Sequence, residues 1–365
     1  MVQDSTAPIR QVEVHAYRIP TQVPESDGTL QWNSTTLVVV HISAGPCIGM
    51  GYGYSDATAA ALIAARLAPA MQDKDALAVD TCWRAMADCV RNLGRSGLCA
   101  QAMAAVDIAL WDLKARLLGV SVARLLGIVR AAVPAYGSGG FTSMTLPALR
   151  EQAREWTHAG LTRVKIKIGR HNTEDVARVQ AVRSTVPAQT EVFVDANGGY
   201  TPALAIRMAH RFAALDVSWF EEPVSSDDLH GLRQVREHAP PGMQISAGEY
   251  GFVPDDFLHL LQARCIDVLQ ADATRCGVTG WLGAAALCDA FHVPMSSHCA
   301  PALHASLCAA TSAALHAEHF EDHARIEARF FDGSARLRDG CLIPDPGAPG
   351  FGLTFKEQDA RCYLT

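Results

Sequence analysis

The sequence predicts an α/β protein built around a closed (β/α) barrel. From about residue 133 onward, a short apolar run followed by an amphipathic helical pattern recurs about eight times. Repeated units of this kind imply a parallel sheet with right-handed crossovers, and about eight of them favour a barrel over a doubly wound sheet. In addition, ionisable residues follow successive strands at intervals of about 20 to 28 residues, the length of one unit.

The part before the barrel has a different texture. Short β-rich runs broken by glycine and proline come first and predict a small antiparallel sheet: VEVHAYRIP, STTLVVVHISAG and GMGYGYS. Helical patterns follow, and the last of them, AQAMAAVDIALWDLKARLLG, ends at Gly119 as a helix C-terminus should. We therefore expect an α+β domain over residues 1–130 and the barrel over residues 131–330.

The barrel strands are predicted one by one from the apolar runs. They are VPAYGSG, RVKIKIG, EVFVDANG, VSWFEEPV, QISAGE, VLQADAT, PMSSH and a last segment near LHAEHF. Helical stretches such as LPALREQAREWTHAG, TEDVARVQAVRSTV and TPALAIRMAHRFAAL lie between them.

Composition excludes several classes of protein. Charges interrupt every apolar run before the ~20 residues that a membrane span needs, and the N-terminus shows no secretory signal. Eleven scattered cysteines without a CxxC pair predict reduced thiols in the cytoplasm. The net charge of −7 and the lack of a basic block make nucleic acid an improbable partner.

The stretch TRVKIKIGR, residues 162–170, places two lysines in an apolar run. In a strand, Lys165 and Lys167 share one face while Val164, Ile166 and Ile168 share the other. Seen alone, this pattern is typical of a solvated face. In a barrel the helices cover the apolar face, so the lysines should point inward at the C-terminal mouth, beside carboxylates that offset their charge.

Ionisable residues also follow the remaining strands. They are Asp195, Glu221, Glu249, Asp272, His298 and Glu318. One acidic residue after a strand is usually a helix cap. Seven consecutive units, counting Lys167, are hard to explain by capping, and the pattern predicts a functional rim.

Three of these residues predict a metal site. Asp195, Glu221 and Glu249 come from adjacent strands, so their carboxylates would repel one another unless a hard cation lies between them. Oxygen-only ligation favours Mg²⁺, with Mn²⁺ a plausible substitute. Asn197 shares the inward face of Asp195 and would add a polar contact, whereas Glu222 should point the other way.

Two bases are expected on either side of this metal. Lys167 would have its pKa lowered by Lys165 and the cation. His298 would be oriented by a hydrogen bond from its imidazole to the Asp272 carboxylate. Read alone, His298 is more often an ordinary histidine, because the chain contains fourteen.

The ordered motifs KIK, VDANGGYT, WFEEP, SAGE, LQADATRCGVTGW and MSSHCAPALH resemble the mandelate racemase subgroup of the enolase superfamily. The resemblance covers essentially the whole chain. It implies a (β/α)7β barrel capped by a domain that the N-terminal part and the C-terminal segment 331–365 form together. One departure is RCGVTG, where GGVTG is usual, and it leaves the loop after Asp272 and the Asp272–His298 geometry open.

The resemblance also implies a reaction. Mg²⁺ on Asp195, Glu221 and Glu249 would bind a small carboxylate substrate, whose α-proton Lys167 or His298 would remove. Lys165 and Glu318 would contact the substrate carboxylate. Dehydration of an acid sugar to a 2-keto acid is the leading expectation, racemisation or epimerisation of an α-hydroxy acid is the alternative, and a silent metal-binding relative is a third. A homo-oligomer, from dimer to octamer, is also implied.

Substrate selectivity is expected in the segment IPTQVPESDGTLQWNSTT, residues 19–36, taken as a loop over the barrel mouth. Asp27, Gln31 and Asn33 would read sugar hydroxyls, and Trp32 would wall an apolar substituent. An ordinary surface loop is the alternative interpretation.

Overall fold

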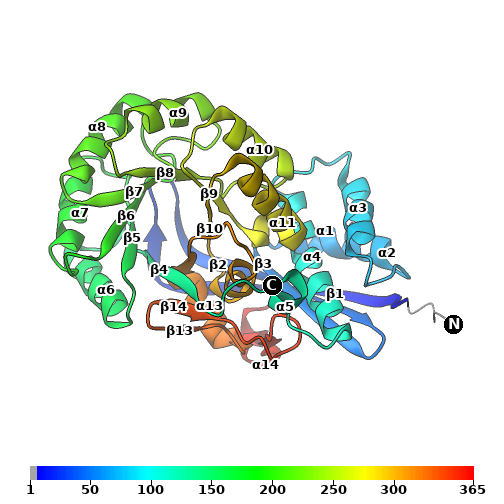
Figure 1. Ribbon diagram of the computed structural model, residues 1–365. Helices are drawn as coiled ribbons and strands as arrows, with labels where there is room; N and C mark the ends of the chain where they lie inside the picture. The colour runs from blue at the N-terminus through cyan, green and yellow to red at the C-terminus, as the bar shows by residue number, and fades with distance from the viewer. Residues whose placement is uncertain (1–5) are drawn as a thin grey trace.

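A computed structural model describes residues 6–365. The molecule consists of a barrel and a cap beside it (Figure 1). The cap contains a three-stranded antiparallel sheet in the order β1-β2-β3, formed by β1 (Ile9–Ser26), β2 (Gln31–Ala44) and β3 (Cys47–Tyr54). Its helices are α1 (Thr58–Leu62), the π-helical segment η1 (Ile63–Leu67), α2 (Ala68–Met71), α3 (Val79–Val90), α4 (Leu98–Leu117) and α5 (Val122–Leu126).

Helix α4 packs directly on β3, and two glycines allow this close approach. A Cβ on Gly49 would lie 2.4 Å from the Ala109 carbonyl oxygen, and one on Gly51 would lie 2.3 Å from that of Ala105. No side chain fits in such a space. The GMGYGYS run is thus explained by backbone contact between the sheet and the longest cap helix.

The segment expected as a loop over residues 19–36 is mostly strand, so this expectation was wrong. Strands β1 and β2 form a long hairpin whose pairing runs from Ile9 and Ala44 to Ser26 and Gln31. Its turn reaches the barrel rim, where a Cβ on Gly28 would meet the carbonyl oxygen of Ala196 at 2.1 Å. The hairpin tip therefore lies on the mouth of the barrel, as the expected loop would have done.

The barrel strands follow one another around a parallel sheet. They are β4 (Val133–Gly139), β5 (Arg163–Lys167), β6 (Glu191–Asp195), β7 (Val217–Glu221), β8 (Gln244–Ala247), β9 (Val268–Ala271), β10 (Met295–Ser297) and β11 (Ala317–Phe320). The order is β10-β9-β8-β7-β6-β5-β4, with β11 on the other side of β4. A parallel bridge between Met295 and Ala314 brings the two ends together, and the (β/α)7β expectation is confirmed.

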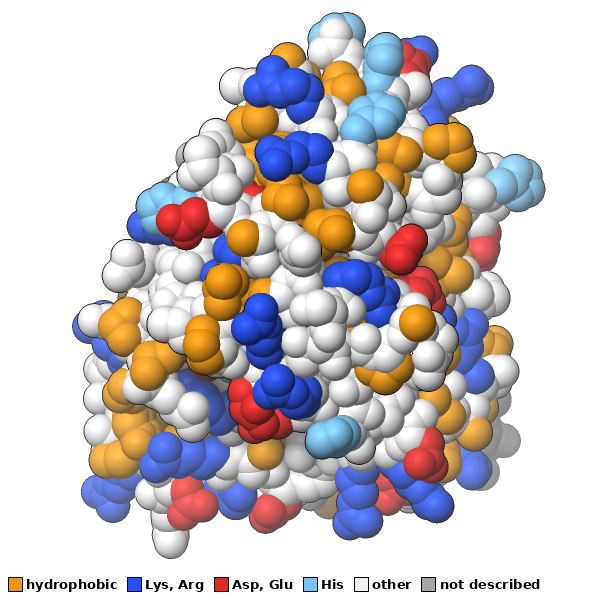
Figure 2. Space-filling view, turned by 90° about the vertical axis from the view of Figure 1, so that its left-hand side faces the viewer, with side chains coloured by type: hydrophobic (Ala, Val, Ile, Leu, Met, Phe, Trp, Pro, Cys, Tyr) orange, Lys and Arg blue, Asp and Glu red, His pale blue; other side chains and the backbone are white. Residues whose placement is uncertain are grey.

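Helices cover the outside of these strands (Figure 1). They are α6 (Leu146–His158), α7 (Asp175–Arg183), α8 (Pro202–Ala213), α9 (Leu229–His238), α10 (Pro254–Ala263), α11 (Ala273–Phe291), α12 (Pro301–Ala309) and α13 (Glu321–Phe330). On the face over α6, α7 and α8, basic and acidic side chains are interspersed (Figure 2).

The residues after α13 form short elements. These are β12 (Phe331–Asp332), β13 (Arg336–Arg338), β14 (Cys341–Ile343), β15 (Thr354–Phe355), α14 (Glu357–Ala360) and the 3₁₀ turn η2 (Arg361–Tyr363). The last residues lie against the cap: Leu364 bridges Tyr17 on β1, and the Thr365 amide donates to the Ala16 carbonyl over 3.0 Å.

The cap also contacts the barrel through a buried carboxylate on α4. Asp107 accepts hydrogen bonds from the Thr279 amide at 2.8 Å and from its hydroxyl at 2.7 Å. Thr279 lies just after Gly277, whose φ of 74° interrupts α11. Asp107 thus satisfies donors at the point where α11 restarts.

Candidate active site

The barrel interior is closed below the mouth by aromatic rings. Tyr136, Phe193, Trp219 and Val268 form a buried cluster inside the strands. Phe193 and Trp219 each lie two residues before a carboxylate that ends its strand, and therefore share its inward face. This apolar floor confines the charged side chains to the C-terminal end of the barrel.

Three carboxylates meet above this floor. Asp195 ends β6, Glu221 ends β7, and Glu249 follows β8. Each offers one oxygen, and these oxygens lie within 4.8 Å of one another with all three residues buried. Glu249 Oε2 is buried without a hydrogen-bond partner. The oxygen donors and the unpartnered carboxylate atom fit a hard divalent cation such as Mg²⁺.

Both lysines of the KIK motif point into the barrel. Val164, Ile166 and Ile168 face the opposite way and pack in the hydrophobic core. Lys165 is 0% exposed and its Nζ lies 2.6 and 2.7 Å from the two oxygens of Glu221 and 2.8 Å from Glu318. Lys167 is 5% exposed and forms an ion pair with Asp195. The solvated-face interpretation is excluded.

These ion pairs determine the pKa of both lysines. Burial lowers the pKa of Lys167, but Asp195 and, more weakly, Glu249 raise it more, so the net pKa lies above its usual value. For Lys165, burial is likewise outweighed by Glu221 and Glu318. Lys165 lowers the pKa of Lys167, as expected from the sequence, but the carboxylate contacts outweigh it. The further lowering expected from the cation stays a prediction.

Glu221 is held by donors from several strands. Besides Lys165, Gln270 Nε2 donates to it at 2.8 Å and Trp219 Nε1 at 3.2 Å. Burial, together with Asp195 and Glu318, nevertheless raises the pKa of Glu221 to about 8, although Lys165 lowers it. Neither Gln270 nor Trp219 was singled out from the sequence, although Gln270 lies two residues before Asp272 on an inward-facing position.

The Asp272–His298 pair forms despite the RCGVTG departure. His298 Nδ1 lies 2.8 Å from Asp272 Oδ2, while Asp272 Oδ1 accepts bonds from the Thr274 amide and hydroxyl at 2.7 Å each. Burial lowers the pKa of His298, but Glu249 and Asp272 raise it more. Helix α11 starts directly after Asp272, and the RCGVTG segment is helical except at Gly277, whose φ of 74° interrupts the helix.

Glu318 lies on β11 and is engaged on both sides. Lys165 contacts one of its oxygens, and the Cys299 amide donates to the other at 2.6 Å. Burial raises the pKa of Glu318, but Lys165 and His298 lower it more, to well below the usual range. The structure thus brings Glu318 to the rim with the other predicted residues.

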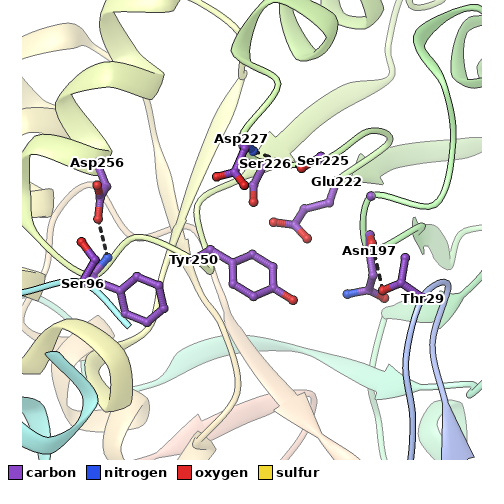
Figure 3. A pocket seen from close by; sticks show the side chains of 11 residues that line it. Thr29, Ser96, Asn197, Glu222, Ser225, Ser226, Asp227, Tyr250 and Asp256 are labelled. Atoms are coloured by element: carbon purple, nitrogen blue, oxygen red, sulfur yellow. Dashed lines mark hydrogen bonds between the residues drawn. The ribbon is translucent and has the colours of Figure 1, made fainter. Parts of the chain in front are cut away.

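Glu222 does not point away from the site, as its place next to Glu221 predicted. Its φ of 37° breaks the strand alternation, and its side chain lies in a cavity of about 540 Å³ with Asn197 and Tyr250 (Figure 3). Glu222 is 1% exposed, and its Oε1 has no hydrogen-bond partner. The EEP motif was the only signal that could have identified it.

Two residues that line this cavity lie close in the sequence to the carboxylates at the strand ends. Asn197 comes two residues after Asp195, and Tyr250 comes directly after Glu249. Asn197 Oδ1 is buried and unpartnered, like Glu222 Oε1. Free acceptors beside the carboxylates can receive hydroxyl hydrogens from a bound molecule.

The residues at the hairpin tip that were expected to contact substrate differ in their surroundings. Asp27 Oδ1 accepts from the amides of Thr29 and Leu30 at 2.7 Å each, so it caps its own turn. Gln31 and Asn33 are exposed, and within residues 6–365 neither forms a hydrogen bond to the carboxylate cluster.

Trp32 contributes to an aromatic wall near Lys167. It packs edge-on against Phe141 with ring centroids 5.7 Å apart, and its Nε1 donates to Glu25 at 2.9 Å. Phe141 in turn packs against Phe320, whose ring centroid is 6.0 Å from Lys167 Nζ. This side of the mouth is apolar.

The described residues thus provide oxygen ligands for a hard cation, with a lysine on one side and a histidine that is hydrogen-bonded to a carboxylate on the other. They lie in a barrel beside a cap that the last residues of the chain also contact. This is the organisation of the enolase superfamily, and the chain belongs to it. Residues 9–127 match the mandelate racemase/muconate lactonizing enzyme N-terminal domain, and residues 148–360 match the enolase C-terminal domain-like family.

Particular relatives include enzymes. The chain is 30% identical over 354 residues to 3,6-anhydro-α-L-galactonate cycloisomerase from Streptomyces coelicolor, covering 94% of this chain and 96% of that protein. It is 31% identical over 320 residues to L-talarate/galactarate dehydratase from Salmonella typhimurium, covering 86% and 78%.

Solved structures agree with this assignment. A mandelate racemase/muconate lactonizing enzyme-like protein from Rubrobacter xylanophilus is 46% identical, with a TM-score of 0.96 over 98% of this chain and 100% of that one. The Salmonella dehydratase, solved with Mg and L-lyxarohydroxamate, has a TM-score of 0.91 and 27% identity over 100% of this chain and 95% of that one. Within residues 6–365 no helix has the length and apolar character needed to cross a membrane.

Proposed function

We propose that this protein removes the α-proton of a carboxylate substrate in an Mg²⁺-dependent reaction and then expels a β-hydroxyl, converting an acid sugar or related hydroxy acid to a 2-keto acid. The observation that carries the proposal is the order of the strands. The carboxylates lie on β6, β7 and directly after β8, between the lysine on β5 and the histidine after β10.

Asp195, Glu221 and Glu249 would hold the cation, with Mn²⁺ as a substitute for Mg²⁺. When bound, the ion would polarise the substrate carboxylate and stabilise the negative charge that develops when the α-proton leaves. Because Asp195 would then be shared between the ion and Lys167, its hold on the lysine proton would weaken and the lysine pKa would fall.

Lys167 is the proposed base on one face of the substrate. Its Nζ reaches the mouth from β5, next to the Phe320 ring. Lys165 lies deeper and is fully buried between Glu221 and Glu318. We propose that Lys165 offsets the charge of the substrate carboxylate and that Glu318, already engaged by Lys165 and the Cys299 amide, positions Lys165.

His298 is the proposed acid on the other face. Its Nδ1 bonds Asp272, which leaves Nε2 free to give or take a proton in the mouth. For dehydration, Nε2 would protonate the departing hydroxyl. Asn197 and Glu222 would accept hydrogen bonds from substrate hydroxyls. Asp27 would stabilise only its own turn, and Gln31 and Asn33 would contact a substrate only at the rim.

Racemisation or epimerisation is the second candidate. Two groups able to exchange a proton reach the mouth from opposite sides of the carboxylates, as inversion at one carbon requires. The wall formed by Trp32, Phe141 and Phe320 also suits an apolar substituent better than a polyhydroxyl chain.

A screen of acid sugars and other α-hydroxy acids would test the proposal. With Mg²⁺, a dehydratase yields a 2-keto acid that semicarbazide detects, a racemase changes only optical rotation, and a silent relative does neither. Addition of excess EDTA should abolish turnover, and restored Mg²⁺ should recover it. Full activity after exhaustive removal of divalent ions would contradict the assigned metal site.

The two faces can be separated by proton exchange. By NMR in D₂O, Lys167→Ala should slow exchange of the α-proton about 10²- to 10⁴-fold. In a dehydratase, His298→Asn should keep this exchange and lose expulsion of the hydroxyl, whereas in a racemase it should lose exchange from the other configuration at C2. His292→Asn, an exposed histidine at the end of α11, is the matched control and should exchange normally. Wild-type exchange in both site variants would exclude them as bases.

The setting of the enzyme is also a proposal. The eleven cysteines are all unpaired, which supports a reducing, cytoplasmic location. The family resemblance supports a homo-oligomer, and light scattering after size-exclusion chromatography would measure its size.

A further inference from the structure

A second group of metal-ligating atoms lies next to the carboxylate triad. His298 Nε2, Cys299 Sγ and a carboxylate oxygen of Glu318 lie within 4.8 Å of one another, and all three residues are buried. Nε2 and Sγ are 3.2 Å apart. We propose that this group is a separate site for Zn²⁺ or a similarly thiophilic divalent ion, and that its occupation inhibits the enzyme.

The spacing of the donors suits a tetrahedral zinc ion. With Zn–N near 2.0–2.1 Å, Zn–S near 2.3 Å and Zn–O near 2.0–2.2 Å, the nitrogen and sulfur ligands lie about 3.6 Å apart and the nitrogen and oxygen ligands about 3.4 Å. The Nε2 to Sγ distance of 3.2 Å is about 0.4 Å shorter than this spacing, and the Glu318 oxygen lies within 4.8 Å of both atoms. Side-chain shifts of this size would let the three donors share one ion.

The histidine is already oriented as a ligand. Its Nδ1 is bound to Asp272 at 2.8 Å. Metal-ligating histidines usually donate their other ring N–H to a carboxylate, which fixes the tautomer and makes the free nitrogen more basic. The same contact that prepares His298 for proton transfer therefore also presents the Nε2 lone pair to a metal ion.

The charge around this group also suits a cation. Three carboxylates, those of Glu249, Asp272 and Glu318, lie around the imidazole and thiol. Lys165 pairs with Glu318 at 2.8 Å, whereas Arg275 lies 3.8 Å from both Glu249 and Asp272. A cation held by the imidazole and the thiolate would therefore be attracted by nearby carboxylates.

Ligand chemistry separates this site from the magnesium site. Imidazole and thiolate select zinc, whereas Mg²⁺ prefers oxygen atoms only. On binding, the Cys299 thiol loses its proton to solvent as the Zn–S bond forms, with no change of oxidation state. The ion would occupy the Nε2 lone pair, so His298 could neither accept nor donate a proton.

Cobalt provides a readout that needs no substrate. Co²⁺ added to the full-length protein saturated with Mg²⁺ should produce the near-ultraviolet thiolate-to-cobalt absorption band, and excess Zn²⁺ should remove it. Cys299→Ser should lack the band or require at least about 100-fold more cobalt. Cys288→Ser is the matched control, a buried cysteine on α11 outside the group, and should keep the band. An unchanged band in Cys299→Ser, or none in the wild type, would overturn the site.

The inhibition rests on the proposed function and is tested separately. At constant excess Mg²⁺, Zn²⁺ should inhibit the wild type and Cys288→Ser reversibly, while Cys299→Ser should resist about 100-fold more zinc. Inhibition that persists in Cys299→Ser and disappears at higher Mg²⁺ would mean that zinc displaces magnesium, and would refute the proposal. Because the cobalt band is independent of turnover, an error in the proposed reaction would leave the test of the site intact.

Discussion

Replacement of Lys165 by methionine tests whether this lysine holds the site together. Methionine keeps the length and apolar stem of the side chain but removes the ammonium that contacts Glu221 and Glu318. Both carboxylates would remain buried without their closest cation. Removal of one partner from a buried ion pair costs about 3–5 kcal/mol, because the remaining charge has lost its compensation.

This free energy translates into a measurable change in melting temperature. An unfolding entropy of about 2.1 cal/mol/K per residue gives about 0.8 kcal/mol/K for 365 residues. The melting temperature of Lys165→Met should therefore lie about 4–6 °C below that of the wild type in EDTA, as measured by differential scanning calorimetry. Mg²⁺ should raise it more in the variant than in the wild type, because the ion would then be the only cation on Glu221.

Lys356→Met is the matched control. Lys356 forms a more exposed ion pair, 3.8 Å from Asp332. Such surface pairs contribute about 0–1 kcal/mol, so the melting temperature should change by about 1 °C or less. If Lys165→Met and Lys356→Met have the same melting temperature in EDTA, the buried lysine does not stabilise the carboxylates and the reasoning is refuted.

Two further predictions concern the cap. Burial raises the pKa of Asp107 to about 7. Since this exceeds the unfolded value near 3.9, the carboxyl should lower wild-type stability progressively from pH 4 to pH 7, by on the order of 4 kcal/mol. Urea unfolding of Asp107→Asn should lack this decline, and an identical pH profile would contradict it. A Cβ at Gly28 would lie 2.1 Å from the Ala196 oxygen, so Gly28→Val should lower stability by about 1–3 kcal/mol and raise KM. Gln22→Val, at an exposed position of β1 in the same hairpin, should leave both nearly unchanged, and equal behaviour of the two variants would exclude tip contact as the cause.

The sequence was informative about the rim because a barrel repeats. Once the strands are placed, each strand end must face the same mouth, so Asp195 and Glu221 could be brought together without coordinates. Pairing between individual charges could not be inferred in this way. Which carboxylate lies nearest Lys167 depends on rotamers and sub-ångström distances, and the Asp195 contact that raises the pKa of this lysine could not be foreseen.

Two misreadings came from local backbone geometry. Glu222 was placed by strand alternation, but its positive φ turns the side chain back toward the mouth. The 19–36 segment suggests a loop because it is polar and contains proline and glycine. Strand β1 lies at the edge of its sheet, where proline is tolerated, and its pairing is irregular between Pro20 and Glu25.

The hairpin tip has a consequence for how selectivity can change during evolution. Its backbone is fixed at Gly28 by contact with the barrel and at Asp27 by a capped turn. The side chains that follow, Thr29 and Leu30, are exposed. Mutations at these two positions can therefore alter what enters the mouth without refolding the tip. In a mutational library confined to residues 29 and 30, most variants should fold normally, so the library would sample new substrate specificities.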